Sequence, residues 1–366
     1  MPSSLEQEVM KMYRLPEEQV QSIKETIIRV MAKDIVPSKR PLAIVVGGQS
    51  GAGKTALINY TSGMSTKREF VQIDNDFFRG FHPQADEIKE KYPDLYTAAT
   101  DQMGLEITSD IIEYFKNNHY NIILHQTLKN NRIADDAMTK FREAGYTVGV
   151  RAFAVPYLES KMSQIERCEG QIEKLGFCRY VRQQDHDAAI EGLPKTVGYI
   201  EDSGKYDFIE IFRRGKKISE PQLVYSKFNP QTEQETLEVL SDCENVSHEN
   251  HSFGFTSAQD AVERTRAEEA LKVAKTLDER IAEAENRESN NEEMQTHIDE
   301  LKLRFMQFKV EQGLVSPEEA NLTEEGSVQA EGSSLQGDSR QFQQTSQTIT
   351  TSTEITNIDL SQPPEA

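Results

Sequence analysis

The stretch AIVVGGQSGAGKTALI, residues 43–58, decides the fold. An apolar run meets a cluster of glycines, then a Lys-Thr pair, then apolar residues at helical spacing. The stretch fits G-x-x-x-x-G-K-[ST], the phosphate-binding loop, at Gly48, Gly53, Lys54 and Thr55. Residues 42–46 predict a buried parallel strand, and residues 56–58 predict the start of a helix. This strand–loop–helix order favours phosphate binding over a glycine-rich turn that holds no ligand.

A loop of this kind binds an anion through its backbone. Its N–H groups point inward, and the helix that follows adds the positive end of its dipole. Lys54 would reach the β- and γ-phosphates, and the Thr55 hydroxyl would ligate Mg²⁺. We therefore predict a site for ATP, or for GTP in its place, together with Mg²⁺. The predicted nucleotide-binding residues are Gly48, Gln49, Ser50, Gly51, Ala52, Gly53, Lys54 and Thr55.

The composition limits the class of protein. A net charge of −20 over 366 residues argues against nucleic-acid binding, because a phosphate backbone would be repelled. The three cysteines form no C-x-x-C pair, which favours buried thiols in a reducing compartment. The chain has no apolar run of membrane-spanning length and no secretory leader. We expect a cytoplasmic protein without nucleic-acid or membrane partners.

Strands and helices alternate between residues 41 and 228, which predicts an α/β fold. We expect a P-loop kinase-like, mostly parallel sheet with helices on both faces. Ligands of such sheets lie beyond the carboxyl ends of the strands. The strand candidates are residues 42–46, 70–73, 121–125, 147–154, 207–212 and 223–225, and helical candidates include residues 104–117 and 135–144.

Four further segments flank this predicted domain. Residues 1–40 are mostly one helix whose apolar stripe packs on the core, and residues 229–255 form a polar linker. Residues 256–312 carry apolar stripes that fit a helical hairpin or a short coiled coil. Because the first stripe is mostly alanine, docking on the chain's own body is at least as well supported as self-association. Residues 313–366 are an acidic, Ser/Thr/Gln-rich tail, predicted to be disordered.

Two aspartates follow the strand candidate at residues 70–73. Asp74 and Asp76 are alternate residues at a strand end, so both carboxylates could face the phosphate loop. Asp76 is the better candidate for the base that accepts a proton from an attacking hydroxyl, and Asp74 is a candidate Mg²⁺ ligand. The alternative is that both are turn or helix-cap residues.

Arginines cluster in a later stretch, residues 165–187. Arg167, Arg179 and Arg182 lie on predicted helices joined by a turn. Such arginines can close over the phosphates of a nucleotide, because guanidinium groups bind phosphate oxygens in pairs. The alternative is a solvated helix face on which they pair with nearby glutamates.

The sequence resembles the zeta toxin family, the kinase toxins of bacterial toxin–antitoxin systems. The resemblance covers roughly residues 10–228. It rests on GGQSGAGKT, IDNDFFRGFHP, NNHYNIIL, AVPYLES, IERCE and GLPKTVGYIEDSGKYDFIEIF. It implies ATP-dependent phosphorylation of a hydroxyl of UDP-N-acetylglucosamine, which would block synthesis of cell-wall precursors in a bacterial cytoplasm. It also implies an antitoxin partner, or an inhibitory segment in the same chain.

The resemblance extends to single residues. Lys54, Thr55 and Asp76 resemble the family's loop lysine, Mg²⁺ ligand and catalytic base, respectively. Glu106 resembles its sugar-binding glutamate. The remaining matches are Thr127 at the substrate and Arg167 and Arg179 at the ATP phosphates, and Lys129 is a further candidate substrate-binding residue at the position of a family arginine.

One segment departs from the family pattern. The family has E-G-T-x-R after the third strand, whereas this chain has His125-Gln126-Thr127-Leu128-Lys129. The carboxylate is absent, and a lysine stands in place of the arginine, so one bidentate donor is lost. The alternative function is therefore a catalytically impaired nucleotide-binding module that acts through its C-terminal helices and tail.

Overall fold

The computed structural model describes residues 4–64, 69–176, 178, 181–217, 220–241, 243, 246–287 and 290–320. The strands are β1 (Leu42–Gly47), β2 (Val71–Ile73), β3 (Ile122–Gln126), β4 (Thr147–Phe153), β5 (Phe208–Arg213) and β6 (Gln222–Phe228). The helices of the first half are α1 (Ser4–Met12), α2 (Glu17–Met31), α3 (Lys54–Ser62), α4 (Asn75–Arg79), α5 (Ala85–Lys91), the 3-10 turn η1 (Pro93–Leu95), α6 (Tyr96–Asn117) and α7 (Asn131–Glu143). Those of the second half are α8 (Tyr157–Leu175), α9 (Gln183–Ser203), α10 (Glu233–Leu240), α11 (Ala258–Glu285) and α12 (Glu292–Glu311).

The six strands form one sheet in the order β2-β3-β1-β4-β5-β6. All neighbouring pairs are parallel except β5 and β6, which are antiparallel. The predicted α/β class and mostly parallel sheet are confirmed. The phosphate loop follows the central strand β1, so it lies at the carboxyl edge, where such sheets bind ligands.

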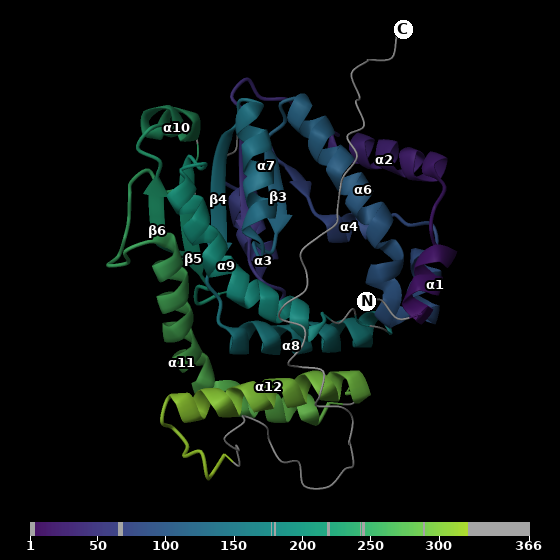
Figure 1. Cartoon of the computed structure of the whole chain (residues 1–366), viewed down its shortest axis with the longest axis vertical. Helices are drawn as coiled ribbons and strands as arrows, with labels where there is room; N and C mark the ends of the chain where they lie inside the picture. The colour runs from purple at the N-terminus through teal and green to yellow at the C-terminus, as the bar shows by residue number, and fades with distance from the viewer. Residues whose placement is uncertain are drawn as a thin grey trace.

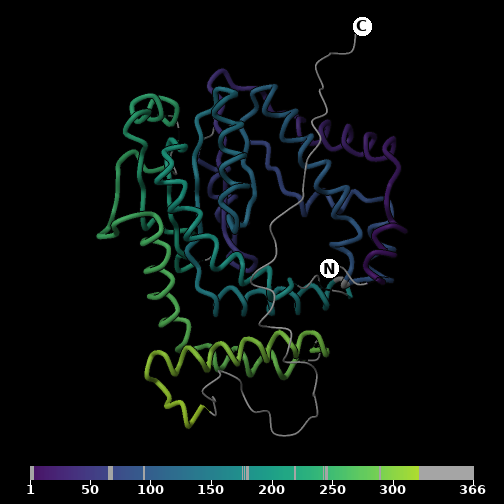
Figure 2. The backbone as a smooth tube through the Cα atoms, in the orientation of Figure 1, coloured from purple at the N-terminus to yellow at the C-terminus, as the bar shows by residue number. Residues whose placement is uncertain are grey.

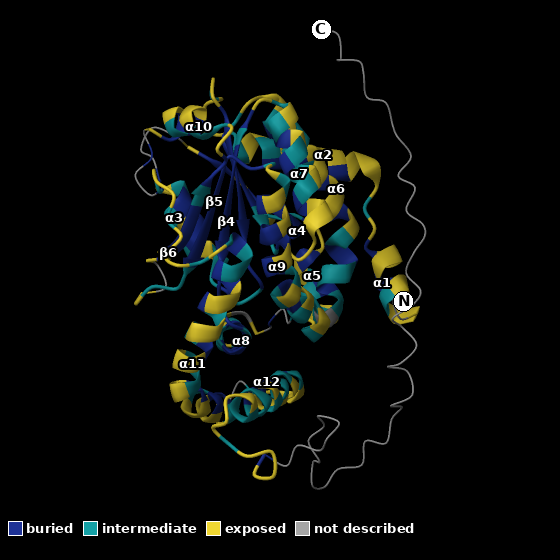
Figure 3. Cartoon of the chain, turned by 60° about the vertical axis from the view of Figure 1, so that its left-hand side comes forward, coloured by how far each residue is buried: buried dark blue, intermediate teal, exposed yellow. Residues whose placement is uncertain are grey.

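Helices pack against the sheet (Figures 1 and 2), and an apolar layer lies on each of its two faces. Along β1, Ala43 and Val45 face one layer while Leu42, Ile44 and Val46 face the other, as the period of two in a strand requires. The first layer is covered by α2, α6, α7, α9 and the start of α11, and the second by α3 and α10. In Figure 3 the strands are buried between helices whose outer faces are exposed.

The prediction of one N-terminal helix is wrong. Two helices, α1 and α2, are separated by residues 13–16. Pro16 has no N–H and disfavours a helical conformation at Leu15, so the chain breaks there before α2 begins. α1 packs against α6 in a small cluster of its own that includes Val9 and Tyr13.

The prediction of a polar linker at residues 229–255 also needs correction, because the segment contains α10. Leu240 of this short helix is buried in the second apolar layer. The mostly polar composition hid a helix of only eight residues, since a single buried face of two turns leaves little periodicity.

The C-terminal helices dock on the chain's own body. α11 contacts α9 and then α8, and α12 lies along α8 (Figure 1). Leu277 and Ile281 of α11 and Ile298 of α12 share a buried cluster with Met162 of α8. Of the predicted acidic tail, residues 321–366 lie outside the described part of the chain. No helix among the described residues is both long and apolar enough to cross a bilayer.

Candidate active site

The phosphate loop is an open turn between β1 and α3. Gly51 and Gly53 have φ angles of 77° and 91°, the left-handed region that glycine tolerates without strain. A side chain at Gly51 would also meet the carbonyl oxygen of Ser160 at 2.0 Å. Lys54 Nζ donates to Gly48 O at 2.7 Å and to Gln49 O at 3.2 Å, so the ammonium lies over the mouth of the loop. Thr55 is exposed in the first turn of α3.

Helix α8 runs beside the loop, and two of its side chains contact Ser50. Gln164 Nε2 donates to Ser50 O at 3.0 Å, and Arg167 Nη2 lies 3.5 Å from Ser50 Oγ. The structure thus places Arg167, predicted as a phosphate-binding arginine, directly at the phosphate loop.

Arg214, just after β5, is a loop contact that sequence reasoning missed. Its guanidinium donates to Gly51 O at 2.5 Å and to Ala52 O at 3.2 Å, and it pairs with Glu159 of α8. Burial lowers the pKa of Arg214, while the charge of Glu159 opposes that shift. The available signal was a pair of arginines directly after a buried strand, at the ligand edge of the sheet.

Asp74 lies at the end of β2 and caps α4. Its carboxylate accepts a hydrogen bond from Asp76 N at 3.0 Å and lies 3.2 Å from His125 Nδ1. Burial alone would raise the pKa of Asp74, but the hydrogen bond and charge of His125, the Asp76 amide and the charge of Lys54 together lower it. The lysine of the loop is therefore close enough to act on this carboxylate.

Asp76 lies in the first turn of α4, beyond the end of β2, with 54% of its side chain exposed. Arg79 Nε lies 3.4 Å from its carboxylate. Arg79 is itself fixed by Asp101 at 2.6 Å and by Thr97 O at 2.8 Å. The buried arginine, which was not predicted, orients the candidate base toward solvent above the sheet edge.

The remaining predicted substrate residues lie on two elements. Lys129 follows β3 and pairs with Asp185 of α9 at 3.0 Å, and Thr127 precedes it in the same partly buried loop. Glu106 lines a cavity of about 30 Å³ together with Tyr13 and other residues from the N-terminal segment.

The face of α6 that contacts α4 near Asp76 is not the face that carries Glu106. Gly104 approaches Asn75 and Arg79 there, and Thr108 Oγ1 lies 3.4 Å from Asn75. Two residues along a helix turn by about 200°. Glu106 consequently faces away from α4, and its contact with a sugar stays a prediction.

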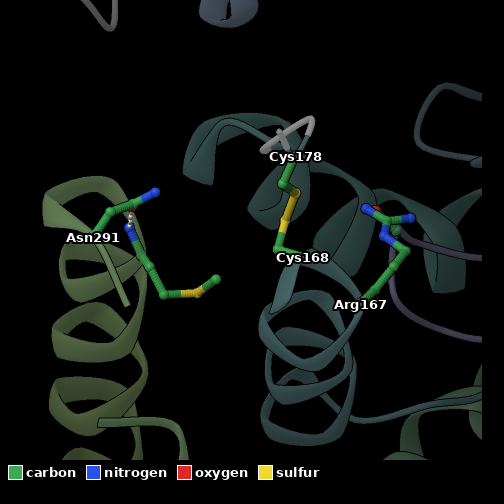
Figure 4. The surroundings of a disulfide bond; sticks show 6 residues. Arg167, Cys168, Cys178 and Asn291 are labelled. Atoms are coloured by element: carbon green, nitrogen blue, oxygen red, sulfur yellow. Dashed lines mark hydrogen bonds between the residues drawn. A yellow bond between two sulfur atoms is a disulfide. The ribbon is translucent and has the colours of Figure 1, made fainter. Parts of the chain in front are cut away.

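A disulfide joins Cys168 of α8 to Cys178, where buried thiols were predicted (Figure 4). The two Cα atoms lie 5.1 Å apart, within reach of a disulfide. Figure 4 shows Arg167 leaving α8 on a different side from the bond. Arg179, the other predicted phosphate-binding arginine, lies outside the described residues.

The family model and the similar proteins found by comparison indicate the same family. The family model for zeta toxin matches residues 28–220. The chain belongs to the zeta toxin family. It is 26% identical to toxin zeta of Streptococcus agalactiae over 199 residues, which are 54% of this chain and 69% of that protein. It is 28% identical to toxin zeta of Enterococcus hirae over 186 residues, 50% of this chain and 64% of that protein.

A solved structure from the PezAT chromosomal toxin-antitoxin system of Streptococcus pneumoniae shares the fold. It has a TM-score of 0.58 and 19% identity, and the match covers 75% of this chain and 99% of that one. Zeta toxins are kinase-type phosphotransferases, and membership of the family supports kinase activity and nucleotide binding for this chain.

The residues present fit a magnesium ion. Mg²⁺ prefers oxygen ligands and commonly takes only one or two carboxylates, keeping several waters. Thr55 is exposed beside the loop, and each oxygen of Asp74 retains a lone pair after its contact with His125 or Asp76. Among the described residues, Thr55 and Asp74 remain the candidates to hold such an ion.

Proposed function

We propose that this chain transfers the γ-phosphoryl group of ATP to a hydroxyl of UDP-N-acetylglucosamine or a related sugar nucleotide. The observation that carries the proposal is the meeting of two groups at one sheet edge. Lys54 and Arg167 contact the phosphate loop, Asp74 and Asp76 follow the strand β2, and the charge of Lys54 contributes to lowering the pKa of Asp74. The phosphorylated product would block synthesis of cell-wall precursors.

The cations of the loop would bind the phosphates. Lys54 now donates to two loop carbonyls, and an incoming β- or γ-phosphate oxygen would replace them with a charge-assisted bond. Arg167, whose Nη2 lies 3.5 Å from Ser50 Oγ, would neutralise charge that develops on the transferred group. Mg²⁺ bound by Thr55 and Asp74 would supply further neutralisation of the β- and γ-phosphates.

Asp76 would act on the acceptor. It takes the proton of the attacking sugar hydroxyl as the oxygen–phosphorus bond forms and the bond from phosphorus to the β–γ bridging oxygen breaks, so that ADP leaves. Arg79, held by Asp101, keeps the carboxylate of Asp76 in one orientation while leaving it exposed to substrate. This fixed geometry is what proton transfer in the transition state requires.

We also propose an antitoxin partner, because the solved relative comes from a toxin-antitoxin system. Intramolecular inhibition is the alternative, since α11 and α12 pack beside the helix that holds the loop.

A mass measurement tests the reaction. The purified chain is incubated with Mg²⁺, ATP or GTP, and a panel of sugar nucleotides, and the acceptors are analysed by mass spectrometry. We expect UDP-N-acetylglucosamine to gain one phosphoryl group, about 80 Da, in a reaction that Lys54→Ala abolishes by removing the cation over the phosphates. Another acceptor gaining this mass would change the substrate, and no gain in any acceptor would contradict the kinase.

The second candidate is a nucleotide-binding module without turnover. The observation in its favour is His125, which lies where the family has its acidic segment and contacts Asp74. ATP binding that depends on Lys54, without phosphoryl transfer to any acceptor, would establish this function in place of the first.

A further inference from the structure

We propose that Arg266, on α11, is a positioning residue for the phosphate-binding loop, so that the C-terminal helices form part of the nucleotide site. The inference rests on the proposed nucleotide-binding function of that loop. Arg266 lies beyond residues 28–220, the part of the chain that matches the family model. It is 217 residues from its loop partner, Gln49.

A proline in α9 creates the first contact. In a regular helix the carbonyl of Ile190 would accept a hydrogen bond from the N–H of residue 194. Residue 194 is proline, which has no N–H, so this carbonyl loses its helical partner. Arg266 Nη1 donates to Ile190 O at 2.7 Å and satisfies it.

The other end of the guanidinium holds the loop. Arg266 Nη2 donates to Gln49 Oε1 at 3.0 Å. Gln49 is fully buried, and its Nε2 donates to Val155 O at 2.7 Å, just after β4. Because a buried amide that loses a partner is costly, these two contacts fix the side chain of Gln49 and with it the backbone between Gly48 and Ser50.

α11 is anchored firmly enough to hold this arginine in place. The amide of Ala258 donates to Glu201 of α9 at 2.6 Å, and Ser257 caps the helix. Gly198 of α9 lets α11 come close, since a Cβ there would lie 2.7 Å from Gln259 Oε1. Figure 1 shows α11 leaving the edge of the sheet and continuing to α8.

The charge of Arg266 suits an anion site. Its Nε is shielded from solvent, and burial lowers its pKa to about 10 although the charge of Glu263 opposes that shift, so it remains protonated at neutral pH. The two oxygens it contacts, on Ile190 and Gln49, are neutral. The positive charge is therefore not cancelled by them and adds to the potential at the loop.

The test compares full-length Arg266→Met and Arg266→Lys with Arg264→Met. Arg264 is an exposed arginine two residues away on α11 that pairs with Asp260, and it serves as the matched control. Two quantities are measured: the affinity for mant-ATP with Mg²⁺, and hydrogen exchange of residues 47–56 without nucleotide. Thermal unfolding checks that each variant is folded.

We expect Arg266→Met to weaken mant-ATP binding about ten-fold or more and to speed exchange in the loop. Arg266→Lys should recover part of the affinity, because one ammonium cannot reproduce the fork that spans both oxygens. Arg264→Met should match the wild type in both measurements.

Other outcomes overturn the proposal. Folded Arg266→Met that binds mant-ATP within two-fold of wild type, with unchanged loop exchange, would show that α11 does not position the loop. Tighter binding would show that α11 restrains the loop instead. Failure of both variants to fold would assign Arg266 to stability alone. If the wild-type chain does not bind mant-ATP but Arg266→Met still speeds hydrogen exchange in the loop, the proposed nucleotide site is refuted. The positioning of the loop by Arg266 would then still hold.

Discussion

At the scale of single residues, the candidate site depends on partners that lie far away in the sequence. Asp74 and Asp76 are visible as a pattern after a strand, but His125 and Arg79, which hold their carboxylates, come from another strand and from a buried helical position. The pattern predicts the reacting groups, and the structure adds the groups that orient them.

Replacing Asp76 with asparagine separates binding from chemistry. The amide cannot accept the hydroxyl proton, so we expect turnover to fall by roughly 10²–10⁴-fold while ATP affinity stays within about two-fold. Turnover and ATP affinity are measured side by side. Asp86→Asn is the matched control, because Asp86 is a fully exposed aspartate on α5 that pairs only at the surface with Lys89. Turnover near wild type in Asp76→Asn would remove this residue from the role of base.

His186 makes the stability depend on pH. It is buried against Ser160 Oγ at 3.0 Å, and burial, followed by the positive charges of Lys161, Arg266 and Lys54, lowers its pKa to about 3. The unfolded chain binds this proton at about pH 6.5, so the contribution is fully present above that pH and is lost as pH falls toward 3. From pH 7 to pH 5, we expect the free energy of unfolding to fall by about 2 kcal/mol through this residue.

Urea unfolding of His186→Phe at the two pH values checks this expectation. The variant should show a pH dependence smaller by about 2 kcal/mol than that of wild type. His119→Asn, which changes an exposed histidine, is the control and should keep the pH dependence of wild type. An equal pH dependence in wild type and His186→Phe would show that His186 is charged or exposed in the folded protein.

At the scale of elements, the alternation of strands and helices in the sequence predicts the sheet. That pattern does not show where helices and loops approach each other closely. Gly192 of α9 is such a position. A Cβ there would lie 2.2 Å from the carbonyl oxygen of Lys129, in the loop that follows β3. The stretch GLPKTVG, residues 192–198, therefore makes three contacts possible. Gly192 and Gly198 have no side chain, so the Lys129 loop and α11, respectively, can approach α9 closely. Pro194 has no N–H, so the carbonyl of Ile190 is left to accept a hydrogen bond from Arg266.

Two glycine substitutions test this account of α9. Gly192→Ala should lower the free energy of unfolding by about 1–3 kcal/mol, because backbone atoms of the Lys129 loop must move. Gly170→Ala in α8 is the matched control: no atom lies within 4 Å of its added Cβ, so it should raise stability by about 0.5–1 kcal/mol. Chemical unfolding measures both. Equal stabilisation by the two changes would mean that Gly192 is not a site of close approach.

Short or irregular elements escaped prediction for a related reason. α10 has one buried face of two turns, and the break between α1 and α2 depends on one proline. The contact of Arg266 with the loop had no signal in the sequence, because Arg266 only adjoins an alanine-rich stripe that indicates packing. Local sequence patterns predict helices and strands, whereas a contact between residues 217 positions apart can be identified only in the folded structure.

At the scale of the whole molecule, cations collect around one glycine loop of a chain whose net charge is −20. Lys54, Arg167, Arg214 and Arg266 all contact atoms of residues 48–52. Since the overall charge would repel an anion, this local concentration is what makes the sheet edge attractive to a nucleotide.

The acidic C-terminal segment should add little to this site. A chain that ends at Ala320 keeps α11, α12 and the buried Ala320 while removing residues that carry few apolar side chains. We expect its melting temperature and ATP affinity to equal those of the full chain, because such a composition buries little apolar surface. A large loss of either property would show that residues 321–366 contribute packing or ligand contacts.

The central claim is that the phosphate loop and the aspartates after β2 form one phosphoryl-transfer site. Phosphorus NMR of the full chain with ATP, Mg²⁺ and UDP-N-acetylglucosamine tests it most directly, because the transferred phosphoryl group is followed from donor to acceptor. The account predicts a new sugar phosphomonoester resonance that grows in step with ADP and disappears in both Lys54→Ala and Asp76→Asn. ADP release without a phosphomonoester, or a phosphomonoester that persists in Asp76→Asn, would contradict it.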